Sequence, residues 1–356
     1  MAFISFKPSD FFNTKLYTGT GSSLANTGVG FQPDITWLKS RSAATSHYLF
    51  DSVRGATKAL FPDLTDAEAA NAEYLKSFDA DGFTVGTNAG INDNTKTYVG
   101  WNWKAGTTSS ITTNGSTTIT PSAYSFSTTS GVSIIKYTGN GTAGAKIAHG
   151  LGKTPQCIIV KETNAAGEGW NTYHIGKSAS GTAQMGNTMF MLLNTDEAQV
   201  DNIYRWNDTT PDSVNFTVGT ADGVNTSGDT YIAYVFANIP GFSNFGGTMG
   251  TGTTDGPFVY TGFEPGFIIW KRNDGATGWY MYSSEIGYND ARGYLQANST
   301  SAEDTNVGNF GLDILSNGFK IRGTHANINT NGGNYIWLCW AKNPMVGSAG
   351  TPGVAV

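Results

Sequence analysis

The sequence predicts an all-β protein made of three tandem antiparallel β-sandwich domains, of jelly-roll or lectin-like type, that derive from an internal repeat. Three observations lead to this prediction. A set of short phrases recurs three times, apolar runs of strand length alternate with Gly, Asn and Asp, and patterns typical of long helices are rare. Many short strands in each hundred or so residues are typical of a two-sheet sandwich.

The first recurring phrase is an apolar run that begins with Pro and ends with Lys six residues later. Its copies occupy residues 33–39, 155–161 and 265–271. Proline has a fixed φ and no N–H group, so it suits the entry to a strand. The β-branched and aromatic residues that follow predict a mostly buried central strand in each copy.

Two further phrases follow the first at partly fixed intervals. The second begins with Phe and ends with Gly, at residues 83–86, 216–219 and 319–323. The third begins with Tyr, twelve residues after that glycine, at residues 98–103, 231–236 and 335–340. In its first copy, Trp101 and Trp103 are two residues apart, which places both indoles on one face of a strand. Fixed intervals at both ends, with variable length between them, indicate three copies of one structural unit.

Each copy is about a hundred residues long, which is enough for a domain with its own core. We therefore predict sandwich domains at 1–105, 132–238 and 241–343, a Ser/Thr-rich linker or hairpin at 106–131, and a weakly structured tail at 344–356. In the linker, Asn114 and Gly115 form a strong signal for a type I′ hairpin turn. The best helix candidate, 63–75, is either a short helix or a polar loop.

The composition argues against nucleic acid and membrane partners. Charged residues make up 13 % of the chain, the net charge is −6, and no basic run exists, whereas phosphate binding requires clustered Lys and Arg. No apolar run reaches the roughly 20 residues of a membrane helix. The first residues lack a signal-peptide pattern, so we expect synthesis in a cytoplasm. Cys157 and Cys339 lie in strand-like runs and are expected to be buried free thiols.

Metal and cofactor sites are not expected from the motifs. The histidines, which show no metal-ligand spacing, are His47, His149, His174 and His325. The Gly-x-Gly patterns lack the strand-to-helix context of a phosphate-binding loop. The segment Asp-Ala-Asp-Gly at 79–82 resembles the start of a calcium loop but lacks the bidentate Glu of that loop. A turn before a strand and a partial Ca²⁺ site at Asp79 and Asp81 both remain open.

An enzymatic role is not expected either. Glycoside cleavage requires two convergent carboxylates about 5 to 10 Å apart. The glutamates near predicted strand ends do not recur between repeats; they are Glu162, Glu168, Glu264 and Glu285. A Gly-x-Ser-x-Gly nucleophile motif is absent from the sequence. A polysaccharide depolymerase is therefore the least favoured alternative.

Six side chains are the best candidates for a binding site. The lysine that ends the first phrase, at Lys39, Lys161 and Lys271, is the only charge kept in all three repeats. It is either a repeated ligand contact or a side chain that caps a buried strand. The strand after this lysine is rich in Trp and Tyr. If these side chains are exposed, they can stack on sugar rings; if they are buried, they fill the core. The carbohydrate-binding candidates are Trp170, Tyr173, Trp279, Tyr282, Lys161 and Lys271.

Several segments of the first repeat resemble virion structural proteins of marine cyanophages and related tailed phages. The segments are 1–21, 29–39, 49–55, 77–86 and 98–105. The similarity is degenerate in the second and third repeats, where the phrase Phe-Asp-Ser-Val-Arg-Gly at 50–55 has no clear counterpart. The resemblance implies a component of the phage particle with lectin-like sandwich domains, and it brings no catalytic residues with it.

The resemblance and the repeats together lead to an expected function. We expect a non-enzymatic virion protein, either a tail fibre or a tail-associated appendage, that contacts the host surface by binding glycans. Repeated modules multiply a weak sugar affinity. A purely architectural virion protein, such as a capsid decoration, neck or baseplate adaptor, is the alternative. The expected partners are other virion proteins, a host cell-surface glycan and, by analogy with fibres, further copies in a homotrimer.

Overall fold

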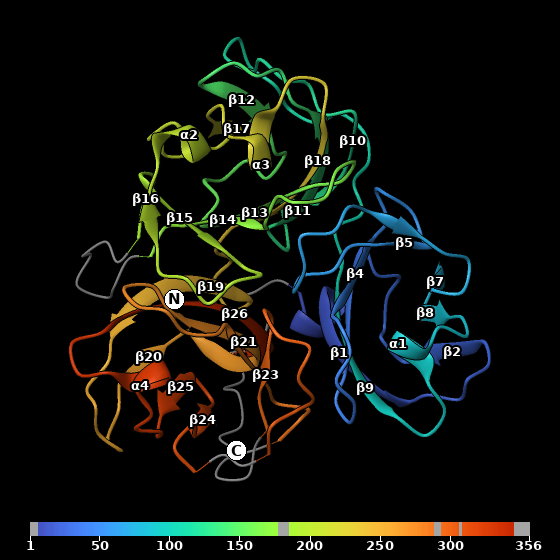
Figure 1. Cartoon of the computed structure of the whole chain (residues 1–356), viewed down its shortest axis with the longest axis vertical. Coiled ribbons are helices and arrows are strands. Elements are labelled where there is room, and N and C mark those ends of the chain that lie inside the picture. The colour runs from blue at the N-terminus through green and yellow to red at the C-terminus, as the bar shows by residue number, and fades with distance from the viewer. Residues whose placement is uncertain (1–5, 177–184, 288–292, 306–307, 345–356) are drawn as a thin grey trace.

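The computed structural model describes residues 6–176, 185–287, 293–305 and 308–344 of the 356-residue chain. Antiparallel strands dominate these residues and the helices among them are short, so the predicted all-β class is confirmed. Figure 1 shows three lobes around a common centre, the first in blue, the second mainly in green and the third in yellow to red. The predicted tail beyond Pro344 lies outside the described residues.

Each sequence repeat supplies a corresponding set of elements. The first contains η1 (Pro8–Asp10), β1 (Phe12–Thr18), β2 (Leu24–Thr27), β3 (Ile35–Ser40), β4 (Tyr48–Asp51), β5 (Lys58–Ala59), β6 (Ala69–Ala70), β7 (Leu75–Asp79), β8 (Gly82–Val85), α1 (Ala89–Asn92) and β9 (Thr97–Trp103). The second, with the linker, contains β10 (Ala123–Ser127), β11 (Val132–Thr138), β12 (Ala145–Ala148), β13 (Cys157–Glu162), β14 (Asn171–His174), β15 (Met189–Leu192), β16 (Val200–Asp201), α2 (Ile203–Trp206), β17 (Asn215–Val218), α3 (Asp222–Asn225) and β18 (Thr230–Phe236). The third contains β19 (Ser243–Met249), β20 (Phe258–Tyr260), β21 (Phe263–Arg272), β22 (Tyr280–Ser283), β23 (Leu295–Gln296), β24 (Leu312–Leu315), β25 (Gly318–Ile321), α4 (Ala326–Asn329) and β26 (Asn334–Pro344).

The same four-strand order occurs in all three repeats. It is β1-β9-β3-β4 in the first, β11-β18-β13-β14 in the second and β19-β26-β21-β22 in the third. The register between the two middle strands also recurs, with pairs Ile35–Trp103, Cys157–Phe236 and Phe267–Trp340. Each repeat adds a small second sheet, made of β2-β8-β7, β12-β17 and β20-β25-β24 respectively. The first and third phrases of the sequence are therefore the two middle strands of each larger sheet.

The two middle strands of each larger sheet are buried on both faces over most of their length. One face forms a peripheral core, for example around Leu38, Phe50 and Phe83 in the first repeat. The other face contributes to a single central core that contains residues from all three repeats. Trp101 and Trp103 both belong to the central core, so the prediction that they share one face of their strand is confirmed. The repeats therefore share a core in addition to their peripheral ones.

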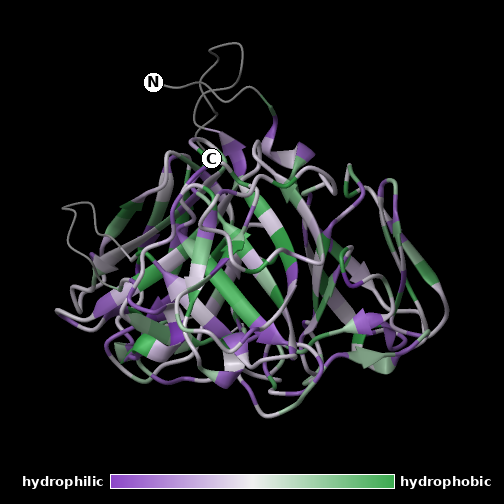
Figure 2. Cartoon of the chain, turned by 90° about the horizontal axis from the view of Figure 1, so that it is seen from above, coloured by the Kyte–Doolittle hydropathy of each residue, from purple (hydrophilic) through white to green (hydrophobic). Residues whose placement is uncertain are grey.

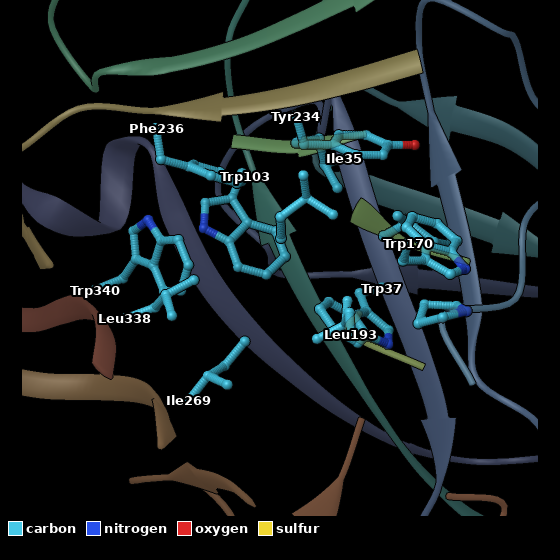
Figure 3. Close-up of a pocket in the computed structure, with 13 residues that line it drawn as sticks. Ile35, Trp37, Trp103, Trp170, Leu193, Tyr234, Phe236, Ile269, Leu338 and Trp340 are labelled. Atoms are coloured by element: carbon cyan, nitrogen blue, oxygen red, sulfur yellow. The ribbon is translucent and has the colours of Figure 1, made fainter. Parts of the chain in front are cut away.

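The central core closes around a small cavity. Figure 3 shows Trp37 and Trp103 of the first repeat, Tyr234 of the second, and Ile269 and Trp340 of the third around it. The cavity has a volume of about 30 Å³ and a hydrophobic lining, so it has neither the size nor the polar groups to hold a ligand. In Figure 2 the hydrophobic segments lie mainly on strands and the hydrophilic ones in loops, in keeping with this interior.

The fixed interval between the second and third phrases has a physical cause. A buried asparagine stands six residues after the glycine, at Asn92, Asn225 and Asn329. Each donates to the carbonyl of that glycine and to a carbonyl of the turn that opens the repeat, and accepts an N–H from the same turn. The glycine is required, because a Cβ at Gly219 would lie 2.3 Å from the Tyr204 carbonyl oxygen.

The structure decides between two local alternatives and corrects one predicted turn. Residues 63–75 form β6, turns and the start of β7, so the polar loop is the correct alternative to a helix. The Phe61 and Leu64 carbonyls accept the indole N–H of Trp170, and such long-range contacts outweigh local helix propensity. In the linker, Asn114 forms a local turn with Ser116, and the hairpin is instead made by β10 and β11.

Cys157 and Cys339 are buried and unpaired, as predicted. Burial raises the pKa of both thiols, which keeps them protonated and unreactive at neutral pH. A bilayer-spanning helix, judged by length and apolar character, does not occur within the described ranges.

Candidate functional site

The six carbohydrate-binding candidates are all buried. Each has an exposed fraction of 1 % or less: Trp170, Tyr173, Trp279, Tyr282, Lys161 and Lys271. Four of them lie on fully buried parts of strands, and Trp170 and Trp279 immediately precede β14 and β22; the four are Lys161 on β13, Tyr173 on β14, Lys271 on β21 and Tyr282 on β22. A ring enclosed by protein has no face available for a sugar, so the surface interpretation of these aromatic residues is wrong and the core interpretation is correct.

The three strand-end lysines link the repeats in a cycle. Each Nζ donates a hydrogen bond to a backbone carbonyl of a different repeat; the pairs are Lys39 to Thr300 at 3.0 Å, Lys161 to Thr65 at 3.3 Å and Lys271 to Asp196 at 3.1 Å. The first repeat thus contacts the third, the second contacts the first, and the third contacts the second. The recurring lysine is a buried link between repeats, which replaces the interpretation of Lys161 and Lys271 as ligand contacts.

These lysines occupy an environment that disfavours their charge. Burial lowers the pKa of each of the three from 10.5 to about 8. Their inter-repeat acceptors are neutral carbonyl oxygens, which favour the ammonium without neutralising it. Lys271 also lies 5.9 Å from the centre of the Trp279 ring. At neutral pH all three remain protonated, so each carbonyl keeps its donor.

A second set of contacts between repeats runs parallel to the first. The indole N–H of Trp170 donates to the Phe61 carbonyl at 2.9 Å, and that of Trp279 donates to the Leu192 carbonyl at 3.0 Å. In the first repeat His47 takes this place, with Nε2 at 2.9 Å from the Gln296 carbonyl oxygen. In each case the carbonyl that contacts the Trp or His stands four residues before the carbonyl that accepts from the lysine of the same repeat. The tryptophans predicted to bind sugar therefore join neighbouring repeats.

The two tyrosine candidates fill peripheral cores. Tyr173 packs edge-to-face against Trp206, with ring centroids 5.9 Å apart. The hydroxyl of Tyr282 donates to the Phe310 carbonyl oxygen at 3.1 Å. Burial raises the pKa of Tyr173, which keeps its hydroxyl neutral. Both side chains are therefore structural.

The phrase at 50–55 that lacks a counterpart in the other repeats forms a buried ion pair. Arg54 donates to Asp51, and the Tyr234 hydroxyl of the second repeat donates to the same carboxylate at 2.7 Å. Glu68 lies 3.2 Å from Arg54 on the other side. Burial acts to lower the pKa of Arg54, but Asp51, Tyr234 and Glu68 together outweigh burial and raise that pKa. The phrase is unique because it fits one contact between the first and second repeats.

Asp79 and Asp81 are engaged in the turn between β7 and β8. The Asp81 carboxylate accepts the backbone N–H groups of Gly28 at 2.9 Å and Gly30 at 2.7 Å, and these bonds lower its pKa. Asp79 accepts two hydroxyl hydrogen bonds from residues of the same hairpin. The contacts favour the turn over the partial Ca²⁺ site. Over the described ranges, no three His, Cys, Asp or Glu side chains converge as metal ligands.

Three histidines are buried in their neutral form. In each, Nδ1 accepts an N–H group, and Nε2 lies 2.9 to 3.1 Å from a backbone carbonyl oxygen; they are His47, His149 and His174. Protonation of Nδ1 would place two hydrogens against each other. Burial, the largest effect, lowers the pKa of His47 to about 3 and that of His149 and His174 to about 4.

The best candidate for a binding site is a groove that sequence reasoning missed. It lies between the second and third repeats, encloses about 740 Å³, and we refer to it as the 2–3 groove. The residues that characterise it are Gln156, Asn238, Asn244, Phe258, Tyr260 and Trp337. Phe258 and Tyr260 are exposed by 46 % and 56 %, whereas Trp337 is nearly buried and packs on Gly246. The sequence signal was the phrase Phe-Val-Tyr at 258–260, which places two aromatic side chains on one face of a short edge strand.

The other two junctions between repeats carry different clefts. The cleft between the first and second repeats has a similar volume, about 750 Å³, but contains the charged residues Asp34 and Lys104. The cleft between the third and first repeats has only about 30 Å³ and contains an ion pair of Lys342 and Glu285, with Nζ and Oε1 3.1 Å apart. Of the three junctions, the 2–3 groove is the one that combines a large volume with an uncharged lining.

One comparison with known proteins gave a match over most of the chain. A family model described as "Domain of unknown function (DUF7483)" matches residues 7–344 and so covers all three repeats at once. Neither the curated proteins nor the solved structures gave a match. The chain therefore belongs to the DUF7483 family.

Proposed function

We propose that this protein is a non-enzymatic component of a tailed-phage particle, a tail fibre or tail-associated appendage that contacts the host surface. The resemblance of the first repeat to virion proteins supports this role. We also propose that the chain arose by threefold duplication of one β-sandwich unit. The recurring strand order, strand register and buried asparagine support the duplication.

One observation carries the proposal of a structural role. The charge that recurs in every repeat, at Lys39, Lys161 and Lys271, is used to tie the repeats to each other. A catalytic group has to face a substrate, whereas these three ammonium groups face backbone carbonyls in the interior. Together with the shared central core, they make the chain a rigid body with a largely uncharged polar exterior, which suits an exposed part of a particle.

The proposed location in the phage particle is tested on particles of the phage that encodes this protein, purified from a lysate of infected host cells. Mass spectrometry should find the protein in the particles, and antibodies against it should label the tail in electron micrographs. The purified protein should bind host cells and reduce phage adsorption. Absence of the protein from intact particles would overturn the proposal.

Trimerisation belongs to the same proposal and rests on the analogy with fibres. Light scattering coupled to size exclusion should give three times the mass of one chain. The cyclic contacts already arrange three repeats around a common core within a single chain. A monomer in solution would therefore remove the trimer from the proposal and leave its other parts standing.

An architectural role is the second candidate, and an apolar surface favours it. Val200, Ile203 and Tyr204, on β16 and α2, have exposed fractions of 47 %, 48 % and 62 %. Exposed apolar clusters of this kind are typical of protein–protein contacts. An Ile203→Glu variant that still binds host cells but no longer enters particles would assign this surface to assembly.

A further inference from the structure

We propose that the 2–3 groove binds an uncharged carbohydrate chain. The inference deepens the proposed function by naming the site and the chemical class of its ligand. It rests on that function only for the source of the ligand, a host surface glycan. The argument uses the two exposed aromatic side chains, the neutral amides beside them, and the contrast with the other two junctions.

Two aromatic side chains stand on one side of β20. Phe258 and Tyr260 are exposed and line the groove, while Val259 between them points into the peripheral core of the third repeat. Residues two apart on a strand lie on the same face, about 6.6 Å apart. The C–H faces of pyranose rings pack against the negative faces of aromatic rings. The pair thus offers two neighbouring platforms to an extended sugar chain.

Amide side chains lie beside these platforms and are held in place. Gln156 Oε1 accepts the Asn238 backbone N–H at 2.8 Å, and Asn238 Oδ1 accepts the Phe245 N–H at 2.9 Å. Asn244 donates to the Thr261 carbonyl at 3.2 Å. Because backbone groups orient the amides, little side-chain entropy is lost when a ligand binds them. The Gln156 Nε2 donates to no group in the described part of the chain, so it remains available to a sugar hydroxyl.

The absence of charge on the described lining selects the class of ligand. The residue after the proline of the first phrase differs at each junction: it is Asp34, Gln156 or Gly266. Aspartate puts a carboxylate at the first junction, whereas glutamine keeps the 2–3 groove polar but neutral. Phosphates and uronic acids require cationic partners, which the described lining does not supply. A volume of about 740 Å³ is large enough for a short oligosaccharide.

The test is titration of the full chain with neutral tetrasaccharides of glucose, mannose, galactose and N-acetylglucosamine, followed by calorimetry and by tryptophan fluorescence. A tetramer of galacturonic acid serves as the charged comparison. We expect saturable binding of at least one neutral tetramer and none of the uronate. Loss of one stacking ring in Tyr260→Ala should weaken that binding about tenfold, and the double variant with Phe258→Ala should abolish it.

The control is Tyr204→Ala, which removes an aromatic side chain of similar exposure from α2, outside the groove. It should bind like the unmodified protein. Thr248→Trp, which fills the groove from β19, should abolish binding without touching either platform. All variants should melt like the unmodified protein, because each changes a side chain at the surface.

Three results would overturn the inference: binding of no neutral tetramer, equal binding by the Phe258 and Tyr260 double variant, or tighter binding of the uronate. Host-cell binding by the double variant separates the two proposals. If cells are still bound while the tetramers are not, the proposed function stands and the groove is not the attachment site. If the tetramers bind but the protein is absent from particles, the groove stands and the proposed function fails.

Discussion

Trp101 illustrates how a single residue connects two repeats. Its ring is fully buried and stacks on Phe267 of the third repeat, with ring centroids 4.7 Å apart. Trp103 stands edge-to-face against Trp340, also of the third repeat, at 5.2 Å. These aromatic pairs belong to the central core. Removal of either tryptophan side chain is therefore expected to destabilise the third repeat as well as the first.

Trp101→Ala should lower the free energy of unfolding by about 3 to 5 kcal/mol, the usual cost of removing a buried tryptophan side chain. Urea denaturation followed by circular dichroism measures it. Tyr204→Ala, at an exposed position, is the matched control and should change the midpoint little. A Trp101→Ala variant as stable as the control would mean that the central core is not packed as described.

The buried histidines predict loss of stability in mild acid. Their pKa values are lowered by burial to about 3 or 4, whereas a histidine in the unfolded chain titrates near 6.5. As the pH falls below about 6.5, the unfolded chain binds protons that the folded chain does not, so stability present above this pH is lost toward pH 4. The urea concentration at the midpoint of unfolding should therefore be highest at pH 7, lower at pH 6 and lowest at pH 5.

His149→Gln provides the test of this cause. Glutamine keeps a donor for the Asp212 carbonyl but does not titrate, so the fall between pH 7 and pH 5 should be smaller than in the unmodified protein. His325→Gln changes a histidine outside the buried set and is the control. An unchanged fall in His149→Gln would show that other groups cause the acid sensitivity.

At the scale of elements, the loop between the second and third phrases is held by one side chain. Asn225 donates to the Gly219 carbonyl at 2.7 Å and the Thr142 carbonyl at 3.0 Å, and accepts the Asn140 N–H at 2.9 Å. The loop before β18 and the turn after β11 are thus fastened together. Asn92 and Asn329 make the same three contacts in the other repeats.

Asn225→Ala should destabilise the protein by about 1 to 3 kcal/mol, because it leaves buried backbone groups without a partner. Hydrogen exchange should become faster at the Asn140 amide, which is the local sign of the lost contact. Asn164→Ala, a change at an exposed asparagine, is the comparison. Equal exchange at the Asn140 amide in both variants would contradict the assigned role.

At the scale of the whole molecule, the larger sheets of the three repeats are joined into one body by a shared core and by cyclic hydrogen bonds. We expect one cooperative unfolding transition for the full chain in calorimetry, with Trp101→Ala shifting the whole transition. The linker and second repeat alone, residues 106–238, expose their part of the central core and should not fold as a monomer. Three separate transitions, or a well-dispersed NMR spectrum from the fragment, would contradict the shared core.

Some features follow from local residue patterns alone. The apolar run from Pro33 to Lys39 predicted a buried strand, and the two-residue spacing of Trp101 and Trp103 predicted a common face. The two cysteines lie within such apolar runs, which predicts their burial, and both are buried. In contrast, the local propensity of residues 63–75 allows a helix, whereas the contact between the Leu64 carbonyl and Trp170 favours the loop.

The sequence by itself determined the all-β class, the position of the middle strands and the burial of the aromatic phrases, because these depend on alternation along one strand. Only the tertiary structure decided what lies against those strands. Lys161, Trp170 and their equivalents contact backbone carbonyls of another repeat. For Lys161 and Trp170 the contacted residue is more than ninety positions away in the chain. The 2–3 groove exists because two repeats meet there. Contacts between residues so far apart in the chain leave no periodic signal in the sequence.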